Sequence, residues 1–245
     1  MECPVLFYVL LLAIAFLYAS VGHGGASGYI ALMALFSFSP EVIRPAALVM
    51  NVFVSGLSFF HFYRAEYFRK ELFLPLAIAS IPTAFIGGMI QMDVQVYKIV
   101  LGLILCFPIL TLSGVLKMGE RENKVSASFF ILFLSGGIIG FLSGIIGIGG
   151  GIILSPLILL FGWANMKETA AISSLFILVN SLAGIIGQKL VGMQLDLNMV
   201  LWVAVVIIGG FVGAFFGASK WNKKILERVL AFVLVIAVYK LIFTG

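Results

Sequence analysis

Charged side chains are scarce in this chain of 245 residues. They account for 10% of the sequence, whereas 62% of the residues are hydrophobic; a soluble domain averages about 25% charged residues. Apolar runs of about twenty residues follow one another with short gaps, as in membrane-spanning helices. The period-two alternation of a transmembrane barrel is absent from the sequence. The composition excludes an ordinary soluble domain and predicts an all-α polytopic membrane protein.

Cysteine and buried carboxylates are scarce as well. Cys3 and Cys106 lie far apart and lack the spacing of metal ligands, so we expect no metal site and no cofactor. No Asp or Glu lies in the middle of an apolar segment, where cation carriers commonly place a carboxylate. This absence favours an anion or a neutral polar solute as the substrate. The net charge of +5 is typical of cytoplasmic Lys and Arg and indicates no nucleic-acid partner.

Ten apolar segments can be delimited, and one sizeable polar stretch, KMGERENKVS at 117–126, interrupts them in the middle of the chain. We predict an N-terminal membrane repeat at 1–116, a cytoplasmic linker at 117–126 and a C-terminal membrane repeat at 127–245. Segments 25–38 and 150–162 are short for a full span, which favours half-helices or re-entrant pieces. The ten segments are 4–20, 25–38, 42–63, 72–91, 96–116, 127–146, 150–162, 167–188, 197–218 and 225–243.

The two halves resemble each other. GHGGASGYIALMALFSF at 22–38 aligns with GIGGGIILSPLILLFGW at 147–163, and the next segments align with Asn51 opposite Ser174. Five crossing segments in each half would turn the second repeat upside down relative to the first. The alternative is a duplicated bundle without a transport pathway. If the N-terminus is outside, the only ones of the 15 Lys and Arg residues to lie outside are Arg44, Lys98, Lys189 and Lys240. This positive-inside bias supports two inverted-topology repeats.

Each half places a glycine cluster directly before its short segment. Glycine permits left-handed backbone angles, and a helix that starts after such a turn exposes unpaired N–H groups and the positive end of its dipole. In inverted repeats, two such helix starts would face one central site, which suits a small oxyanion. The alternative is that the glycines only allow close helix packing. The turn residues predicted to bind substrate are Gly22, His23, Gly24, Gly25, Gly147, Gly149, Gly150 and Gly151.

A polar stripe follows each turn. Asn51 and Ser55 share one face of the segment 42–63, and serines and Gln188 repeat at seven-residue spacing in the segment 167–188. Polar groups in membrane helices seek partners or a wet cavity, so the stripes predict cavity walls, with hydrogen bonding between packed helices as the alternative. The wall residues predicted to bind substrate are Asn51, Ser55, Ser173, Ser174 and Gln188.

Two histidines and two basic residues are further candidates. His23 lies inside the first turn, where the second turn has Ile148. Imidazole titrates near neutral pH, so His23 and His61 are candidates for proton coupling, with ordinary packing near the interface as the alternative. Arg44 and Lys167 lie near the starts of equivalent segments and are candidates for attracting an anion, unless they simply snorkel to the interface.

At these residues the sequence resembles a known family. GHGGASGYIAL and GIGGGIILSPLILL, each followed by an Ala-Ala segment with Ser or Asn, look like the turns of the TauE/SafE sulfite exporter family (TSUP) over nearly the whole chain. The resemblance implies a duplicated permease for small sulfur-containing anions, located in bacteria in the inner membrane. The first half departs from the commoner pattern, with His23 inside its turn, Ala26 in place of a third consecutive glycine, and Ala31 where the second half has Pro156.

Together these features predict a secondary transporter of anions such as sulfite, sulfoacetate or other organosulfonates, which works by alternating access with an anion site at the repeat interface. Its partners would be the small anion and the lipid bilayer, and a homo-oligomer stays open. No catalytic cluster and no nucleotide-binding loop occurs in the sequence, so we expect neither an enzyme nor an ATP-driven pump. The alternatives are an anion channel of the same architecture and a permease for another small organic anion.

Overall fold

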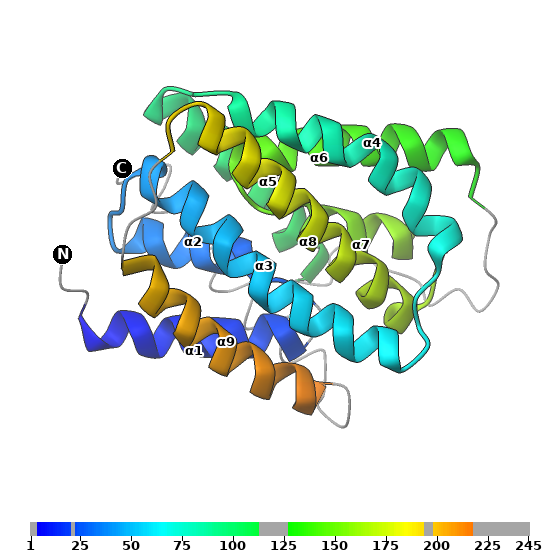
Figure 1. The fold of residues 1–245 in the computed structure, drawn as a ribbon, viewed down its shortest axis with the longest axis horizontal. Coiled ribbons are helices and arrows are strands. Elements are labelled where there is room, and N and C mark those ends of the chain that lie inside the picture. Colours follow the sequence, from blue (N-terminus) through cyan, green and yellow to red (C-terminus); the bar gives the residue numbers. More distant parts are fainter. Residues whose placement is uncertain (1–3, 21–22, 113–126, 194–197, 218–245) are drawn as a thin grey trace.

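The computed structural model describes residues 4–20, 23–112, 127–193 and 198–217, and its regular structure over these residues is entirely helical (Figure 1). Nine of the ten predicted segments coincide with these helices. The tenth segment, 225–243, and the predicted linker at 117–126 lie outside the described residues. The helices are α1 (Val5–Ser20), α2 (Ala26–Leu35), α3 (Pro40–Arg64), α4 (Lys70–Met89), α5 (Val94–Leu112), α6 (Phe129–Ile146), α7 (Gly151–Leu160), α8 (Met166–Leu190) and α9 (Asn198–Gly217).

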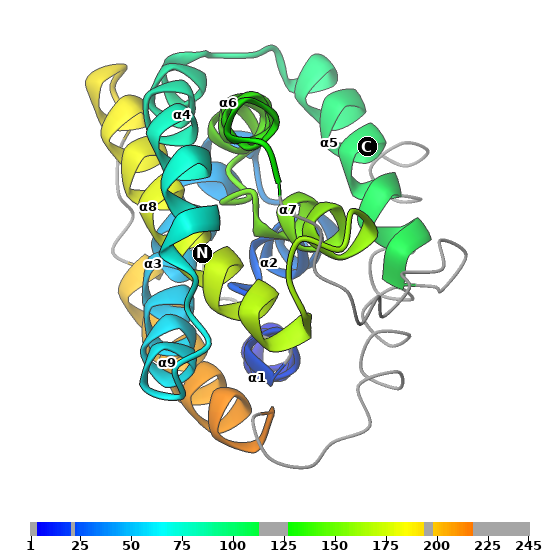
Figure 2. The same cartoon turned by 90° about the vertical axis from the view of Figure 1, so that its right-hand side faces the viewer.

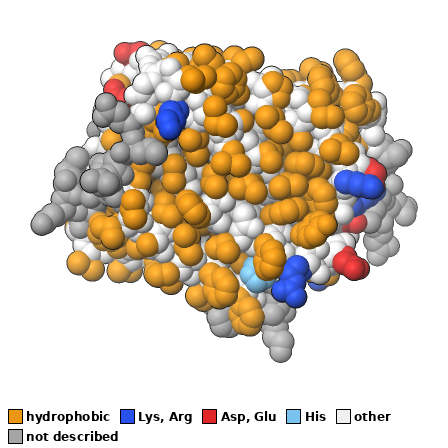
Figure 3. Space-filling view, viewed as in Figure 1, with side chains coloured by type: hydrophobic (Ala, Val, Ile, Leu, Met, Phe, Trp, Pro, Cys, Tyr) orange, Lys and Arg blue, Asp and Glu red, His pale blue; other side chains and the backbone are white. Residues whose placement is uncertain are grey.

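Hydropathy and length make this a membrane fold. Helices α3, α4, α6 and α8 are long and apolar enough to cross a bilayer. In the space-filling view, hydrophobic side chains cover the broad middle of the visible face, and charged side chains gather toward its edges (Figure 3). An exposed belt of apolar side chains is stable in lipid and would aggregate in water. The prediction of an all-α polytopic membrane protein is confirmed.

Helices α1 and α2 form a hairpin whose two open ends lie together. The ring of Phe7, near the start of α1, lies 5.3 Å from the ring of Phe36 and 5.5 Å from that of Phe38, both just after α2. At the other end of the hairpin, the hydroxyls of Tyr18 and Ser27 are 2.7 Å apart and share a hydrogen bond. Because α3 begins shortly after Phe38, this hairpin opens at the end of the molecule where α3 starts, here called the proximal end.

Helices α6 and α7 form a second hairpin, which opens at the other end. The carbonyl of Trp163, just after α7, accepts a hydrogen bond from Nη1 of Arg69 in the α3–α4 connection. Trp163 also packs in one apolar cluster with Leu72 and Phe73 at the start of α4. This second hairpin therefore opens where α3 ends, the distal end. Figure 2 shows α1 and α6 end-on, with α2 and α7 between them.

The helix contacts of one half recur in the other. Helix α1 packs along α9, and α6 packs along α4. These two contacts are equivalent if α1 to α4 of the first half correspond to α6 to α9 of the second half. The same correspondence pairs the α2–α3 contact with the α7–α8 contact, while α3 and α8 pack against each other. This pattern has the form expected of a duplicated chain.

Glycines let the longest helix contacts come close. Gly136, Gly140 and Gly144 of α6 lie one turn apart and face the backbone of α4. Gly209 of α9 faces the backbone of α1 in the same way: a Cβ at Gly209 would lie 2.6 Å from the carbonyl oxygen of Leu12. Membrane helices associate through such small-residue contacts because lipid provides no hydrophobic drive between them.

Alanine at Gly140 should therefore destabilise the fold. Its Cβ would lie 2.6 Å from the Cα of Ser80, so the helices would have to separate, at a cost of about 1–3 kcal/mol. Gly137→Ala is the matched control, since that Cβ would meet the Cβ of Ala79 at an ordinary 3.7 Å. We expect thermal unfolding in detergent to show a lower Tm for Gly140→Ala only. Equal Tm values for the two variants would contradict this close contact.

Candidate functional site

The two glycine turns meet at the side chain of Asn51, in the middle of α3. A Cβ at Gly24 would lie 2.7 Å from Oδ1 of Asn51, and a Cβ at Gly149 would lie 2.7 Å from its Nδ2. Each turn also abuts Ile177 of α8, at 2.9 Å and 2.8 Å respectively. The turns thus approach the two ends of one carboxamide, although they are more than a hundred residues apart in the chain.

The backbone of both turns requires glycine. Gly25 and Gly150 are the N-caps of α2 and α7, with φ of 94° and 78°, and Gly147 and Gly149 also have positive φ. No side chain caps either helix start. Two short helices therefore begin at the centre of the protein with their N-termini close to Asn51. Gly22, which was predicted as part of the first turn, lies outside the described residues.

When α3 and α8 are matched by their ends, the register between the two halves differs from the one that the sequence alignment gives. α3 and α8 are both 25 residues long, so matching their ends pairs Asn51 with Ile177 and Ser55 with Ser181. The alignment of Asn51 with Ser174 is therefore displaced by about one helical turn. The reason is that the alignment matched polar residues of the two segments, whereas in the structure both helices are placed by their contact with the glycine turns.

Two buried polar atoms at this meeting point have no hydrogen-bond partner among the described residues. Nδ2 of Asn51 donates to the carbonyl of Ile148 over 3.2 Å, but its Oδ1 is unpartnered. The Oγ of Ser181 is unpartnered too, and it lies 2.9 Å from where a Cβ of Gly149 would be. Both side chains are fully buried. An unsatisfied buried polar atom costs about 1–3 kcal/mol, which a bound polar ligand or water would offset.

Three predicted wall residues already have partners. Ser55 donates to the carbonyl of Asn51 over 2.6 Å and Ser174 donates to that of Ala171 over 3.0 Å, each within its own helix. Ser173 accepts a hydrogen bond of 2.8 Å from the hydroxyl of Ser155 in α7. For Ser173 the alternative raised from the sequence, bonding between packed helices, describes the structure. Of the predicted wall residues, Asn51 contacts Gly24 and Gly149 through its side chain, and Ser173 lies beside Gly151 through its carbonyl oxygen.

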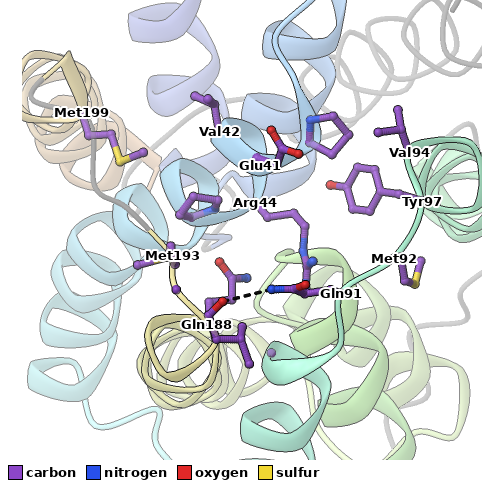
Figure 4. A pocket seen from close by; sticks show the side chains of 15 residues that line it. Glu41, Val42, Arg44, Gln91, Met92, Val94, Tyr97, Gln188, Met193 and Met199 are labelled. Carbon is purple, nitrogen blue, oxygen red and sulfur yellow. Dashed lines mark hydrogen bonds between the residues drawn. The ribbon is translucent and has the colours of Figure 1, made fainter.

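Gln188 and Arg44 lie elsewhere, in a cavity of about 640 Å³ at the proximal end (Figure 4). This proximal cavity lies between the start of α3, the α4–α5 connection and the end of α8. It is lined by Pro40, Glu41, Val42, Arg44, Pro45, Gly88, Gln91, Met92, Val94, Tyr97, Gln188, Val191, Gly192, Met193 and Met199.

The proximal cavity adjoins the second glycine turn. Tyr97 lines it and donates its hydroxyl hydrogen to the carbonyl of Ile146 over 3.1 Å. A Cβ at Gly147 would lie 3.0 Å from the carbonyl oxygen of Arg44. Arg44 and Asn51 are seven residues apart on α3, so they share one helix face about two turns apart. The cavity and the meeting point of the turns therefore follow one another along α3.

The other candidates are spread over the molecule. Lys167 is exposed at the distal end, where its Nζ donates to the hydroxyl of Tyr67 over 3.0 Å and lies 4.9 Å from that ring. The two basic candidates thus lie at opposite ends and form no common site. His61 is half-buried and stacks edge-on against Phe60 and Phe211. His23 is half-buried beside Gly24, and its backbone N–H donates to the carbonyl of Tyr18 over 2.9 Å.

Comparison with known proteins agrees with this membrane architecture. The family model described as sulfite exporter TauE/SafE matches residues 6–241. This chain belongs to the TauE/SafE sulfite exporter family. The probable membrane transporter protein y4hK of Sinorhizobium fredii is 34% identical over 238 residues, which cover 94% of this chain and 94% of that protein. No solved structure matches the chain.

Family membership confirms the resemblance seen in the sequence. It makes the chain a member of a family of membrane transporters, which accords with the long apolar helices. The comparisons identify the family and do not assign roles to individual residues. Those roles therefore depend on the geometry of the turns and of the proximal cavity.

Sequence reasoning missed two kinds of site residue. Gln91 and Tyr97 line the proximal cavity but flank a short connection, where no periodic pattern marks them. Ile177 lies opposite Asn51 at the turns, yet its apolar side chain gives no signal in an apolar helix. Ser181 was recognised as part of a polar stripe, and only the register of α8 against Gly149 shows that it reaches the centre.

Alanine at Gly149 should destabilise the protein more than alanine at Gly192. Both positions have positive φ, at 72° and 94°, and both would incur the left-handed penalty of about 1–2 kcal/mol. A Cβ at Gly192 meets nothing within 4 Å, whereas one at Gly149 overlaps Asn51 and Ile177. Thermal unfolding should therefore give a clearly lower Tm for Gly149→Ala. If both variants lowered the Tm by the same amount, the turn would not be packed against Asn51.

Proposed function

We propose that the protein is a secondary transporter of small sulfur-containing anions such as sulfite, sulfoacetate or other organosulfonates, located in the bacterial inner membrane. The observation that carries the proposal is the convergence of two uncapped helix N-termini on Asn51. A helix N-terminus offers N–H donors and a positive dipole end, which suit an oxyanion. Family membership supports the sulfur chemistry of that anion.

We further propose that the two halves are inverted repeats. The α1–α2 hairpin opens at the proximal end and the α6–α7 hairpin at the distal end, so equivalent parts of the two halves enter from opposite sides. The positive-inside bias then makes the proximal end the outer face, since Arg44 and Lys189 belong to it and Arg64, Arg69 and Lys70 do not. In this arrangement the hairpin tips meet near the bilayer midplane, where transporters of this kind bind substrate.

Alternating access follows if one repeat rocks against the other around Asn51. The anion would enter through the proximal cavity past Arg44 and Gln188, and would then occupy the space between the turns, Asn51 and Ser181. Movement of the α6–α7 hairpin relative to α3 would break the bond from Asn51 to Ile148 and open the distal side. Ser174, Ser173 and Ser55 would support the walls through their helix contacts.

Counterflow in proteoliposomes tests the proposal directly. We expect labelled ethanesulfonate to accumulate transiently in vesicles preloaded with unlabelled sulfonate, because a carrier exchanges substrate across the membrane. Sulfite and sulfoacetate should compete, and sulfate and acetate serve as comparison anions. Flux without trans-stimulation would indicate a channel instead. Exchange of acetate but of no sulfur anion would indicate a permease for another organic anion and would contradict the proposed substrate.

Asn51→Leu should abolish most of this transport without unfolding the protein. Leucine has a similar shape but cannot hydrogen-bond an anion or Ile148, so we expect the exchange rate to fall about tenfold or more, the effect of about 1.4 kcal/mol. Asn180→Leu is the matched control. Asn180 is equally buried, but its amide donates to Phe176 within its own helix. Loss of transport in both variants to the same extent would mean that Asn51 has no special role.

Proton coupling, if present, should depend on the histidines. His23 adjoins Gly24 at the meeting point of the turns, while His61 lies ten residues beyond Asn51 on α3. We expect a pH dependence of exchange in the parent protein to disappear in the double variant His23→Ala, His61→Ala, and to persist in His61→Ala alone. An unchanged pH profile in the double variant would exclude both histidines as proton carriers.

A further inference from the structure

The proximal cavity contains side chains of both charge signs. Of the residues that line it, Arg44 is the cation and Glu41 the anion, and the remainder are polar amides, an aromatic ring and apolar side chains. Both charged residues belong to the first turns of α3 and are three positions apart, which places them on neighbouring faces of that helix. In Figure 4 the Arg44 side chain extends toward Gln91 and Gln188, whereas the Glu41 side chain lies on the side of Arg44 away from Gln91.

Arg44 is held in place and still has a donor to offer. Its Nη1 and Nη2 both donate to the carbonyl of Ile90 over 3.2 Å. Its Nε is buried and has no partner among the described residues. The guanidinium is therefore fixed by one carbonyl oxygen, which does not neutralise its charge. An anion in the cavity can supply both the missing acceptor and the missing negative charge.

Gln188 supplies a second unpaired donor in the same cavity. Its side chain is only 4% exposed, and its Nε2 has no partner in the described part of the chain. The neighbouring Gln91 connects the two walls, because its Nε2 donates to the carbonyl of Val191 over 3.0 Å, three residues beyond Gln188. Arg44 and Gln188 come from different halves of the protein, so an oxyanion bound by both would link α3 to α8.

Glu41 adds a condition on the charge of the ligand. It is exposed at the cavity, and no ion pair joins it to Arg44 or to any other described residue. Its carboxylate repels a second negative charge on a ligand whose first is bound at Arg44. It would equally attract a positive group at the same place. At an effective dielectric constant of about 20, which is typical of charge pairs near a protein surface, such an interaction is large enough to change affinity severalfold even after screening by salt.

We propose that the proximal cavity is a separate, charge-selective binding site for small sulfonates, in which Arg44 and Gln188 bind the sulfonate group and Glu41 selects against a second negative charge. This site prefers organic monoanions and zwitterions with an ammonium group, and it binds dianions such as sulfoacetate more weakly without excluding them. The proposal rests on the proposed transport function and narrows its substrate class. It also makes the cavity a first filter, placed before the site at Asn51.

Three probes with the same two-carbon skeleton test this selectivity: ethanesulfonate, 2-aminoethanesulfonate and ethane-1,2-disulfonate. Their affinities for the full-length purified protein can be measured by calorimetry. In the parent protein we expect the disulfonate to bind most weakly. In Glu41→Gln, the affinity for disulfonate relative to 2-aminoethanesulfonate should rise about tenfold, because one repulsion and one attraction are lost together. Glu71→Gln, a change in the first turn of α4 at the distal end, should leave that ratio unchanged.

Further variants separate this site from the one at Asn51. Gln188→Leu and Arg44→Gln should each weaken ethanesulfonate binding at least about fivefold, as expected for a lost hydrogen bond to a charged group. Arg44→Lys, which keeps the charge, provides a second measurement if Arg44→Gln fails to fold. Asn51→Leu should retain ethanesulfonate binding at the cavity although it no longer transports.

An unchanged affinity ratio in Glu41→Gln would overturn the charge filter. Undiminished binding in both Gln188→Leu and Arg44→Gln, or in Gln188→Leu and Arg44→Lys if Arg44→Gln fails to fold, would overturn the site itself. In both cases the parent protein would still bind and exchange sulfonates, so the proposed transport function would stand. If the parent binds none of the three probes and exchanges neither these probes nor sulfite and sulfoacetate, the proposed function is wrong and the cavity proposal falls with it.

Discussion

The centre of this protein depends on the packing of one carboxamide between two turns that have no side chains. Gly24 and Gly149 can reach opposite ends of Asn51 only because neither has a Cβ. The same contact requires the left-handed backbone at Gly25 and Gly150, which starts α2 and α7 with their N-termini near the centre. Polar groups that are shielded from water at such a place cost free energy unless they form hydrogen bonds. Two polar atoms at this contact, Oδ1 of Asn51 and Oγ of Ser181, have no partner among the described residues, and they are the basis of the proposed ligand site.

The two sides of this centre are not equivalent. On α3 the polar Asn51 is hydrogen-bonded to the second turn through Ile148, whereas its counterpart on α8, Ile177, is apolar and contacts both turns by packing alone. The α6–α7 hairpin is thus tied to the opposite half by a hydrogen bond. The proximal cavity is similarly asymmetric, since matching the helix ends places Ala170 of α8 opposite Arg44. The two halves therefore differ in chemistry at equivalent places of α3 and α8.

Hydropathy was sufficient to predict the helices, because segment length and apolarity are local properties that lipid imposes directly. The glycine turns were found because glycine occurs twice at the same place in a repeated pattern. The register of α3 against α8 could not be predicted from the sequence, because it depends on where each helix meets a turn. Ser55 and Ser174 illustrate a further limit: a serine in a polar stripe can bond its own helix, and the sequence alone does not distinguish that from a cavity wall.

The proximal cavity could not be predicted as a unit, because it is assembled from segments far apart in the chain. Arg44 bonds Ile90, and Gln91 bonds Val191, across separations of 46 and 100 residues. Nε of Arg44 and Nε2 of Gln188, which have no partner in the part of the chain that the structure describes, become recognisable as donors only when their surroundings are known. Individually Arg44 and Gln188 were candidates from the sequence, for different reasons, and the structure places them together.

The proposed mechanism is that one buried site at the glycine turns is reached from both sides of the membrane in turn. Its most direct test is the labelling of Ser181→Cys, a nearly isosteric change beside Gly149, in a chain whose Cys3 and Cys106 are replaced by serine. A small membrane-impermeant thiol reagent is applied to one side of oriented vesicles at a time. The account predicts labelling from each side, slowed in both cases by ethanesulfonate. Labelling from one side only, at a rate that the anion does not change, would contradict it.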